Sequence, residues 1–129
     1  KERLNFFPLY FDVSNPSSNI GWWQRERKGF IERLNFDTVL ALAFEHHLAI
    51  AKNIPLEDVI NWITSLAPKG IIEFVPKNDQ TIQSMITLKG DIFPNYNLEN
   101  FKKLLSNTAR ITSEKTVSKS GRTLFSFEK

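Results

Sequence analysis

The segment of residues 36–43 constrains the possible folds more than any other part of this sequence. Its residues, FDTVLALA, are nearly all apolar, which is typical of a parallel strand covered on both faces of its sheet. Behind Pro55, apolar residues recur at helical spacing over residues 56–66, which predicts a helix that packs one face against the sheet. The apolar residues 71–75 predict the next strand, and strand, helix and strand form a right-handed crossover unit. The sequence therefore predicts an α/β fold.

Two further elements are predicted before this unit. Residues 6–11 (FFPLYF) are a short aromatic strand candidate that stops at Asp12, and turn-forming residues follow at 14–19. Residues 25–34 predict a charged helix, although Gly29 weakens it. Both elements would extend the α/β pattern toward the N-terminus.

The C-terminal half predicts two more helices and then a change of character. Apolar residues at helical spacing indicate helices over residues 80–88 and 98–105. Residues 110–117 and 122–128 are rich in strand-forming residues and are joined by the short segment SKSG at 118–121. A connection this short requires an antiparallel hairpin. The chain is therefore expected to end its sheet in a hairpin.

The net charge of +3 is confined to the end of the chain. Residues 110–129 contain five basic and two acidic residues, whereas basic and acidic residues are equal in number before residue 110. A basic edge hairpin commonly discourages the addition of further strands, so the charge does not by itself indicate a nucleic-acid-binding face. Nucleic acid is therefore a disfavoured partner.

Composition limits the architecture and the location of the protein. A chain of 129 residues with 41% hydrophobic residues suits one compact core, so residues 1–129 are expected to form a single domain. The longest apolar run, residues 39–44, is far shorter than the roughly 20 residues of a membrane span, so no membrane association is expected. The absence of cysteine excludes thiolate metal sites and suits a reducing cytoplasm. Because the chain begins at Lys1 and its one methionine is Met85, we expect a processed chain, an engineered one or an excised fragment.

The strand contents and the terminal hairpin resemble the second half of class I S-adenosylmethionine-dependent methyltransferases. Asp12 closes an aromatic strand, residues 36–42 match the fourth strand of that family and residues 70–75 match the fifth. The pattern Phe-Asp-x-Val-x-Ala, followed by the His-His-Leu segment of residues 46–48, is similar to an uncharacterised bacterial branch sometimes labelled nodulation-protein-related. The resemblance implies a partial Rossmann-like sheet of the third to seventh strands that ends in an antiparallel hairpin.

The glycine-rich loop that holds the cofactor in that family has no counterpart here. Five glycines are present, and no two are close enough to form it. The resemblance therefore implies the C-terminal portion of a methyltransferase domain without its first two strands. The full-length chain would bind S-adenosylmethionine and methylate a small molecule or a macromolecule, whereas the fragment alone would be inactive and bind no cofactor tightly. The expected partner is the missing N-terminal segment of the same protein, or a second copy of the chain.

The strand order of the family makes an isolated fragment awkward. That order is third, second, first, fourth, fifth, seventh, sixth. The strand ending at Asp12 would thus be separated by two absent strands from the strand that starts at Phe36, a gap of about 14 Å at the usual strand spacing. We therefore expect either that the missing segment is supplied from elsewhere or that the sheet is rearranged.

Four residues follow the third and fourth strands of this scheme, where open α/β sheets bind their ligands. Asp12 could accept a hydrogen bond from the adenine amino group, as the acid after the third strand does in the family, or it could cap the turn that follows. Asn15 with Pro16 resembles the Asn-Pro element of amino-group methyltransferases but lacks the aromatic residue that completes it, and a turn explains it better. Ala43 and Phe44 would line the cofactor site.

His46 and His47 are the candidate catalytic residues. They follow the fourth strand, which in the family lines the methyl-transfer pocket, and imidazole can accept a proton from a substrate near neutral pH. Adjacent side chains diverge, so at most one of the two is expected to face the site. Structural histidines at a helix entry are an equally weighted alternative. No metal is expected, because Glu45 is the one further ligand near the two histidines and the histidines are not spaced four residues apart on a helix.

Four residues are candidates for contacting the substrate. Trp22 and Arg27 belong to the segment of residues 22–28, which mixes aromatic and cationic side chains as single-stranded nucleic acid sites do. The same segment could be a lid over substrate or cofactor, or its tryptophans could anchor a helix to the core. Glu73 and Lys77 lie in and after the fifth strand and could approach the substrate, although a solvated loop explains Lys77 equally well.

Two other functions are kept beside methyl transfer. One is a non-catalytic binding module for RNA or a protein partner, which would use the tryptophan-arginine segment. The other is a hydrolase that uses His46 or His47, against which the absence of a Gly-x-Ser-x-Gly turn counts.

Overall fold

The computed structural model describes residues 5–129. The chain divides into two compact units, Lys1–Leu34 and Asn35–Lys129, and each is described by itself. We call them the N-terminal unit and the sheet unit. No helix in the described part of the chain is long and apolar enough to cross a membrane. The assignment of residues 1–129 to a single domain stays a prediction.

The N-terminal unit contains little regular structure. A short 3-10 helix, η1, covers Trp22–Gln24, and one turn of α-helix, α1, covers Phe30–Arg33. The helix expected over residues 25–34 is therefore mostly wrong. The first residues of this segment form no helix, and Arg27 forms an isolated antiparallel bridge with Ile20. The helix begins only after Gly29.

Residues 6–11 form no strand, so the expected third strand is wrong. The aromatic side chains that suggested it, Phe6, Phe7 and Tyr10, are exposed. A strand is held by hydrogen bonds to a neighbouring strand, and the structure gives this segment no strand partner. Apolar composition therefore indicated neither burial nor a pairing partner for this segment.

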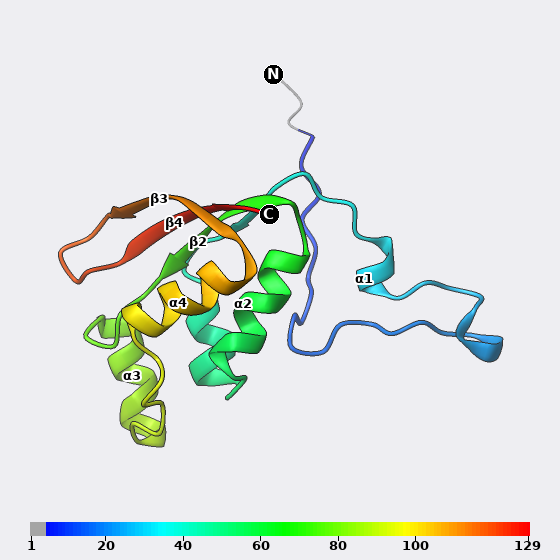
Figure 1. The fold of residues 1–129 in the computed structure, drawn as a ribbon. Coiled ribbons are helices and arrows are strands. Elements are labelled where there is room, and N and C mark those ends of the chain that lie inside the picture. The colour runs from blue at the N-terminus through cyan, green and yellow to red at the C-terminus, as the bar shows by residue number, and fades with distance from the viewer. Residues whose placement is uncertain (1–4) are drawn as a thin grey trace. The chain divides into compact units, whose positions relative to one another are not determined.

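The sheet unit is built on a mixed open sheet of four strands (Figure 1). Their order is β1-β2-β4-β3, with β1 parallel to β2 and β4 antiparallel to both of its neighbours. The α/β class, the parallel pair and the terminal hairpin are thereby confirmed. The bounds of the strands are β1 Val39–Ala41, β2 Lys69–Phe74, β3 Arg110–Thr116 and β4 Thr123–Glu128.

Strand β1 is shorter than the apolar segment that predicted it. Only Val39–Ala41 pair with β2, although residues 36–43 were expected to be extended throughout. β1 lies at the edge of the sheet in the described part of the chain, so it is held on one side only. Gly70 pairs with Val39, and a Cβ added there would overlap the Val39 carbonyl oxygen and lie 2.9 Å from the Phe127 ring. Only glycine fits between these strands.

The three helices expected in the sheet unit are all present. Figure 1 shows α2 and α4 side by side on one face of the sheet. Asp79 and Asn97 cap α3 and α4 by accepting hydrogen bonds from the backbone N–H of Thr81 and Asn100. A single π-helical turn, η2, follows β1 and was not predicted. The bounds are η2 His47–Ala51, α2 Leu56–Ser65, α3 Gln80–Lys89 and α4 Leu98–Thr108.

The core lies between this helical layer and the sheet. Phe101 of α4 is fully buried, and its ring centroid is 5.1 Å from that of Phe74 and 5.4 Å from that of Phe125. The opposite face of the sheet is different. Leu40 on that face is 63% exposed, and its neighbour in register, Ile71, is only half-buried. The expectation that β1 is covered on both faces therefore does not hold for this unit.

Candidate functional site

A group of polar side chains gathers near the carboxyl ends of β1 and β2. This is the edge at which open α/β sheets bind their ligands. The residues come from five separate segments of the sheet unit, and all but Arg122 are buried. We call them the strand-end cluster: Glu45, His46, Glu73, Asp79, Tyr96 and Arg122.

Glu73 holds the turn that leaves β1. Its Oε2 accepts a hydrogen bond from the backbone N–H of Ala43 at 2.6 Å. Ala43 has a φ of 49°, a left-handed conformation that costs a non-glycine residue free energy and that its surroundings must impose. Glu73, expected to approach the substrate, thus contacts the backbone of the expected cofactor residue Ala43. Phe44, the other such residue, is half-buried in the same turn.

Glu45 forms a buried hydrogen-bonded group with Tyr96 and Val75. Its Oε1 accepts from the Val75 N–H at 3.1 Å and lies 2.8 Å from the Tyr96 hydroxyl oxygen. That hydroxyl is also 2.7 Å from the Val75 carbonyl oxygen. A phenol has one hydrogen to donate, and the Val75 carbonyl can only accept it. If Tyr96 donates to that carbonyl, the contact between Tyr96 and Glu45 needs a hydrogen on the Glu45 carboxyl. All these contacts are therefore satisfied when Glu45 is protonated. Burial agrees with this, because it raises the pKa of Glu45 to about 8.

The protonated state of Glu45 predicts a decline of stability above neutral pH. Between its ordinary pKa of 4.5 and about 8, Glu45 holds a proton in the folded chain that the unfolded chain has lost. This favours folding at low pH, and the contribution is lost as the pH rises through that range. The lowered pKa of His46 acts in the opposite direction, but only below its ordinary value of 6.5. Between pH 6.5 and 8 we expect the free energy of unfolding to fall by about 1 kcal/mol.

Glu45→Gln tests this expectation. The glutamine amide can donate to the Tyr96 oxygen as the protonated carboxyl does, and it does not titrate. Urea unfolding followed by circular dichroism at pH 6.5 and 8 should show the decline in the free energy of unfolding in the unmutated chain and not in the variant. A decline of the same size in both chains would place its cause in another residue.

His46 is buried, and its Nδ1 has no hydrogen-bond partner. Its ring centroid lies 4.3 Å from that of His47, whose side chain is exposed. Burial, and then the charges of His47 and Arg122, lower the pKa of His46 to about 4. The imidazole is therefore neutral at pH 7, and Nδ1 can accept a hydrogen bond from a ligand. The two histidines thus differ in burial, and His46 carries the one buried side-chain polar atom among the described residues that has no hydrogen-bond partner.

Arg122 joins the terminal hairpin to the start of α3. Its Nε and Nη2 donate to the two carboxylate oxygens of Asp79 at 2.8 and 2.9 Å. Its Nη1 also lies 3.6 Å from Glu73 Oε1, and Ser120 of the hairpin turn donates to Asp79 at 2.8 Å. The paired guanidinium lowers the pKa of Asp79 well below its usual range. One arginine thus links the hairpin, β2 and α3.

Removing this arginine is expected to destabilise the sheet unit. Arg122→Gln would leave the buried carboxylate of Asp79 without its two-pronged partner, at a cost of about 2 kcal/mol in free energy of unfolding. Arg110→Gln is the matched control, because Arg110 pairs with Glu128 at 2.9 Å on an exposed part of the same hairpin and should cost less than about 0.5 kcal/mol. Urea unfolding of both variants measures the difference. Equal costs would contradict a special role for Arg122.

The remaining expected site residues make local contacts. Asp12 caps its own turn, because its Oδ1 accepts from the N–H and the hydroxyl of Ser14 at 2.9 and 2.6 Å, and Asn15 closes the turn by donating to the Asp12 carbonyl at 3.1 Å. These are the contacts expected if Asp12 and Asn15 form a turn rather than a cofactor site. Lys77 pairs with Asp91 at 2.7 Å on the surface.

The tryptophan-arginine segment lies in the N-terminal unit. Trp22 and Trp23 are 82% and 74% exposed, so within the N-terminal unit their rings are not packed. The Arg25 guanidinium lies 4.2 Å from the centroid of the Trp23 ring. Arg27 forms the backbone bridge with Ile20. The segment is thus an exposed aromatic and cationic surface.

Four residues of the strand-end cluster were not predicted as site residues: Glu45, Asp79, Tyr96 and Arg122. Glu45 stands next to the predicted His46, but nothing in the sequence signals its burial. Asp79 carries a signal, because an aspartate before a predicted helix is a typical N-cap. Arg122 follows Gly121 of the hairpin and Tyr96 lies in a loop, and neither position distinguishes them from surface residues. Only the three-dimensional contacts identify them.

The chain is similar to a much longer nodulation protein. It is 54% identical over 125 residues to the nodulation protein NoeA of Rhizobium meliloti (strain 1021). The match covers 97% of this chain and 26% of NoeA, so the chain spans about a quarter of the length of that relative. No protein-family model matches the chain. The expected similarity to nodulation-related proteins is thereby confirmed, and the chain corresponds to one part of a longer relative.

Proposed function

We propose that this chain forms the fourth to seventh strands of an S-adenosylmethionine-dependent methyltransferase domain. The strand order carries the proposal. In the family the last four strands of the sheet stand in the order fourth, fifth, seventh, sixth, and the order β1-β2-β4-β3 corresponds to it strand for strand. The last strand of the chain, β4, runs antiparallel between β2 and β3, which agrees with the hairpin ending of the family.

The charges of the strand-end cluster suit a positively charged methyl donor. The carboxylates of Glu73 and Asp79 share the single guanidinium of Arg122, while Glu45 and His46 are neutral at pH 7. The cluster therefore carries a net negative charge. Such a charge favours a cation at the same edge of the sheet.

In this proposal His46 orients the methyl acceptor. Bound S-adenosylmethionine supplies a methyl group on sulfur for in-line attack by a nucleophile. His46 Nδ1, which is buried and has no partner, accepts a hydrogen bond from the acceptor's hydroxyl or amine. Glu73 fixes the Ala43 turn from which His46 projects. Because its pKa is low, His46 acts mainly by positioning the acceptor.

The missing strands of the domain are the proposed partner of this chain. β1 is paired on one side only in the described residues, and the side chain of its Leu40 is exposed. An unpaired, apolar edge strand readily accepts another strand. We expect the β1 amides to exchange hydrogen more slowly in full-length NoeA than in this chain. We also propose a cytoplasmic location, which the absence of cysteine suits.

Isothermal titration with S-adenosylmethionine tests the proposal. We expect binding by full-length NoeA in the micromolar range that is typical of cofactors, and binding at least about tenfold weaker by this chain alone, which has no glycine-rich loop. The proposal would be supported if NoeA bound S-adenosylmethionine saturably and lost this binding when the part that matches this chain was deleted. Binding by neither protein would refute it.

The exposed tryptophans favour RNA binding as a second candidate function. Trp22 and Trp23 offer two aromatic surfaces beside the guanidinium of Arg25, and bases stack on such surfaces. A fluorescently labelled single-stranded RNA would bind this chain with an affinity that falls steeply with salt. Replacing both tryptophans with alanine should abolish that binding. RNA binding that does not depend on salt, or that is unchanged in the double alanine variant, would exclude this site.

A further inference from the structure

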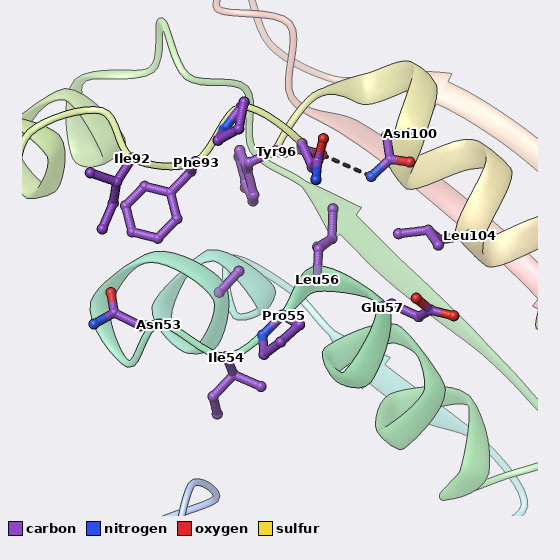
Figure 2. Close-up of a pocket in the computed structure, with 13 residues that line it drawn as sticks. Asn53, Ile54, Pro55, Leu56, Glu57, Ile92, Phe93, Tyr96, Asn100 and Leu104 are labelled. Atoms are coloured by element: carbon purple, nitrogen blue, oxygen red, sulfur yellow. Dashed lines mark hydrogen bonds between the residues drawn. The ribbon is translucent and has the colours of Figure 1, made fainter.

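A pocket opens on the helical side of the sheet unit, apart from the proposed methyl-transfer site. It lies between the start of α2 and the loop that precedes α4 (Figure 2). Its volume is about 530 Å³, within the range of pockets that bind small molecules. All of its walls belong to the sheet unit. The main lining side chains are Ile54, Leu56, Ile92, Phe93, Tyr96 and Leu104.

The pocket walls are largely apolar and incompletely covered. Ile92 is 64% exposed, and Ile54, Phe93 and Leu104 are half-buried. Figure 2 shows the side chains of Ile92 and Phe93 on the side of the loop, facing the segment of Asn53 and Pro55 that leads into α2. A ligand with an apolar body would remove this surface from water, which is favourable in proportion to the area covered.

The polar groups of the pocket are nearly all uncharged. Asn53, Asn95 and Asn100 contribute amides or carbonyls, and Asn100 donates to the Asn95 carbonyl at 2.8 Å. Among the described lining residues there is no Lys, Arg or His, and Glu57 supplies the one carboxylate. An anionic ligand would meet repulsion from Glu57. The nearby Lys89 ammonium lies outside the lining and already donates to the carbonyls of residues 50 and 51 and to Asn53 Oδ1. The wall chemistry therefore selects against nucleic acids and carboxylates.

Tyr96 connects the pocket with the strand-end cluster. It lines the pocket, and its hydroxyl lies 2.8 Å from Glu45 and 2.7 Å from the Val75 carbonyl oxygen. Ala43, His46 and Glu73 do not line the pocket. The pocket is thus a separate cavity that shares one side chain with the cluster.

We propose that this pocket binds an uncharged small molecule that has an apolar body and carries amide or hydroxyl groups. The apolar walls hold the body of the ligand, and the asparagine amides at the rim hold its polar groups. Glu57 excludes anionic relatives of the ligand. This binding does not depend on methyl transfer, so it can be tested without S-adenosylmethionine.

A matched pair of probes tests the proposal. N-acetyl-L-phenylalaninamide is uncharged, whereas N-acetyl-L-phenylalanine differs by a carboxylate. Methyl NMR spectra of this chain, with Ile54 and Ile92 as reporters, should shift on addition of the amide with a Kd of about 1 mM. The carboxylate should bind about fivefold more weakly, because it would lie near Glu57.

Two variants separate specific binding from nonspecific contact. Glu57→Gln should strengthen binding of the carboxylate probe about fivefold and leave binding of the amide unchanged. Leu104→Trp should fill the pocket and abolish binding of both, while Leu88→Trp, at an exposed position of α3, should not. Equal affinity for the two probes in the original chain, or binding unaffected by Leu104→Trp in a folded variant, would overturn the proposal. So would the absence of shifts at saturating amide concentration.

Discussion

Phe101→Ala is expected to lower the free energy of unfolding of the sheet unit by about 3–5 kcal/mol. Phe101 is fully buried, and its ring contacts those of Phe74 and Phe125 at centroid distances of 5.1 and 5.4 Å. Truncation would remove the contact between α4 and two strands and leave a cavity that rigid neighbours cannot fill. Urea unfolding followed by far-ultraviolet circular dichroism measures the loss.

Leu88→Ala is the control for a large apolar side chain on a helix. Leu88 lies in α3 and is 89% exposed, so its truncation should change stability by no more than about 0.5 kcal/mol. If the two variants lost similar stability, the helical layer would not be packed on the sheet through Phe101.

His46→Gln is expected to reduce methyl transfer about 100-fold, because a misplaced acceptor loses the alignment that in-line attack requires. The residue presents an unpartnered Nδ1 that no other side chain of the described chain could replace at that position. The measurement requires the missing strands, so it uses NoeA in which this chain replaces the matching segment. Formation of S-adenosylhomocysteine, with a bacterial extract as the source of acceptor, gives the rate.

His47→Gln is the matched control in the same protein. His47 is exposed and lies one residue further along the chain, so its replacement should change the rate less than about threefold. A large loss with His47→Gln and none with His46→Gln would reverse the assignment of the two histidines. Equal S-adenosylmethionine affinity in both variants would show that the cofactor site is intact.

The elements that sequence predicted correctly are those whose signal is local. Helices α2, α3 and α4 carry their own apolar period, α3 and α4 also carry their own side-chain caps, and the hairpin carries its short turn. The strand expected at residues 6–11 failed because a strand needs a neighbour, which composition cannot reveal. β1 was shortened for the same reason, since it is paired only with β2.

The candidate site was predictable only where its residues follow the strands directly. His46 was expected because it follows β1, but its burial and its low pKa depend on residues distant in sequence. Glu45 meets Tyr96 from 51 residues away, and Asp79 meets Arg122 across 43 residues. Such contacts follow from the strand order, in which β4 joins β2, and no local pattern encodes them.

The central position of β4 has a consequence for the order in which the sheet can form during synthesis. β4 is the last of the four strands to leave the ribosome, yet it lies between β2 and β3 and pairs with both. Until it emerges, β2 has an unpaired edge and β3 has no partner strand, and unpaired edges are prone to join other chains. A nascent chain stalled before residue 122 would therefore carry β2 with an open edge, also without the arginine that ties the hairpin to α3.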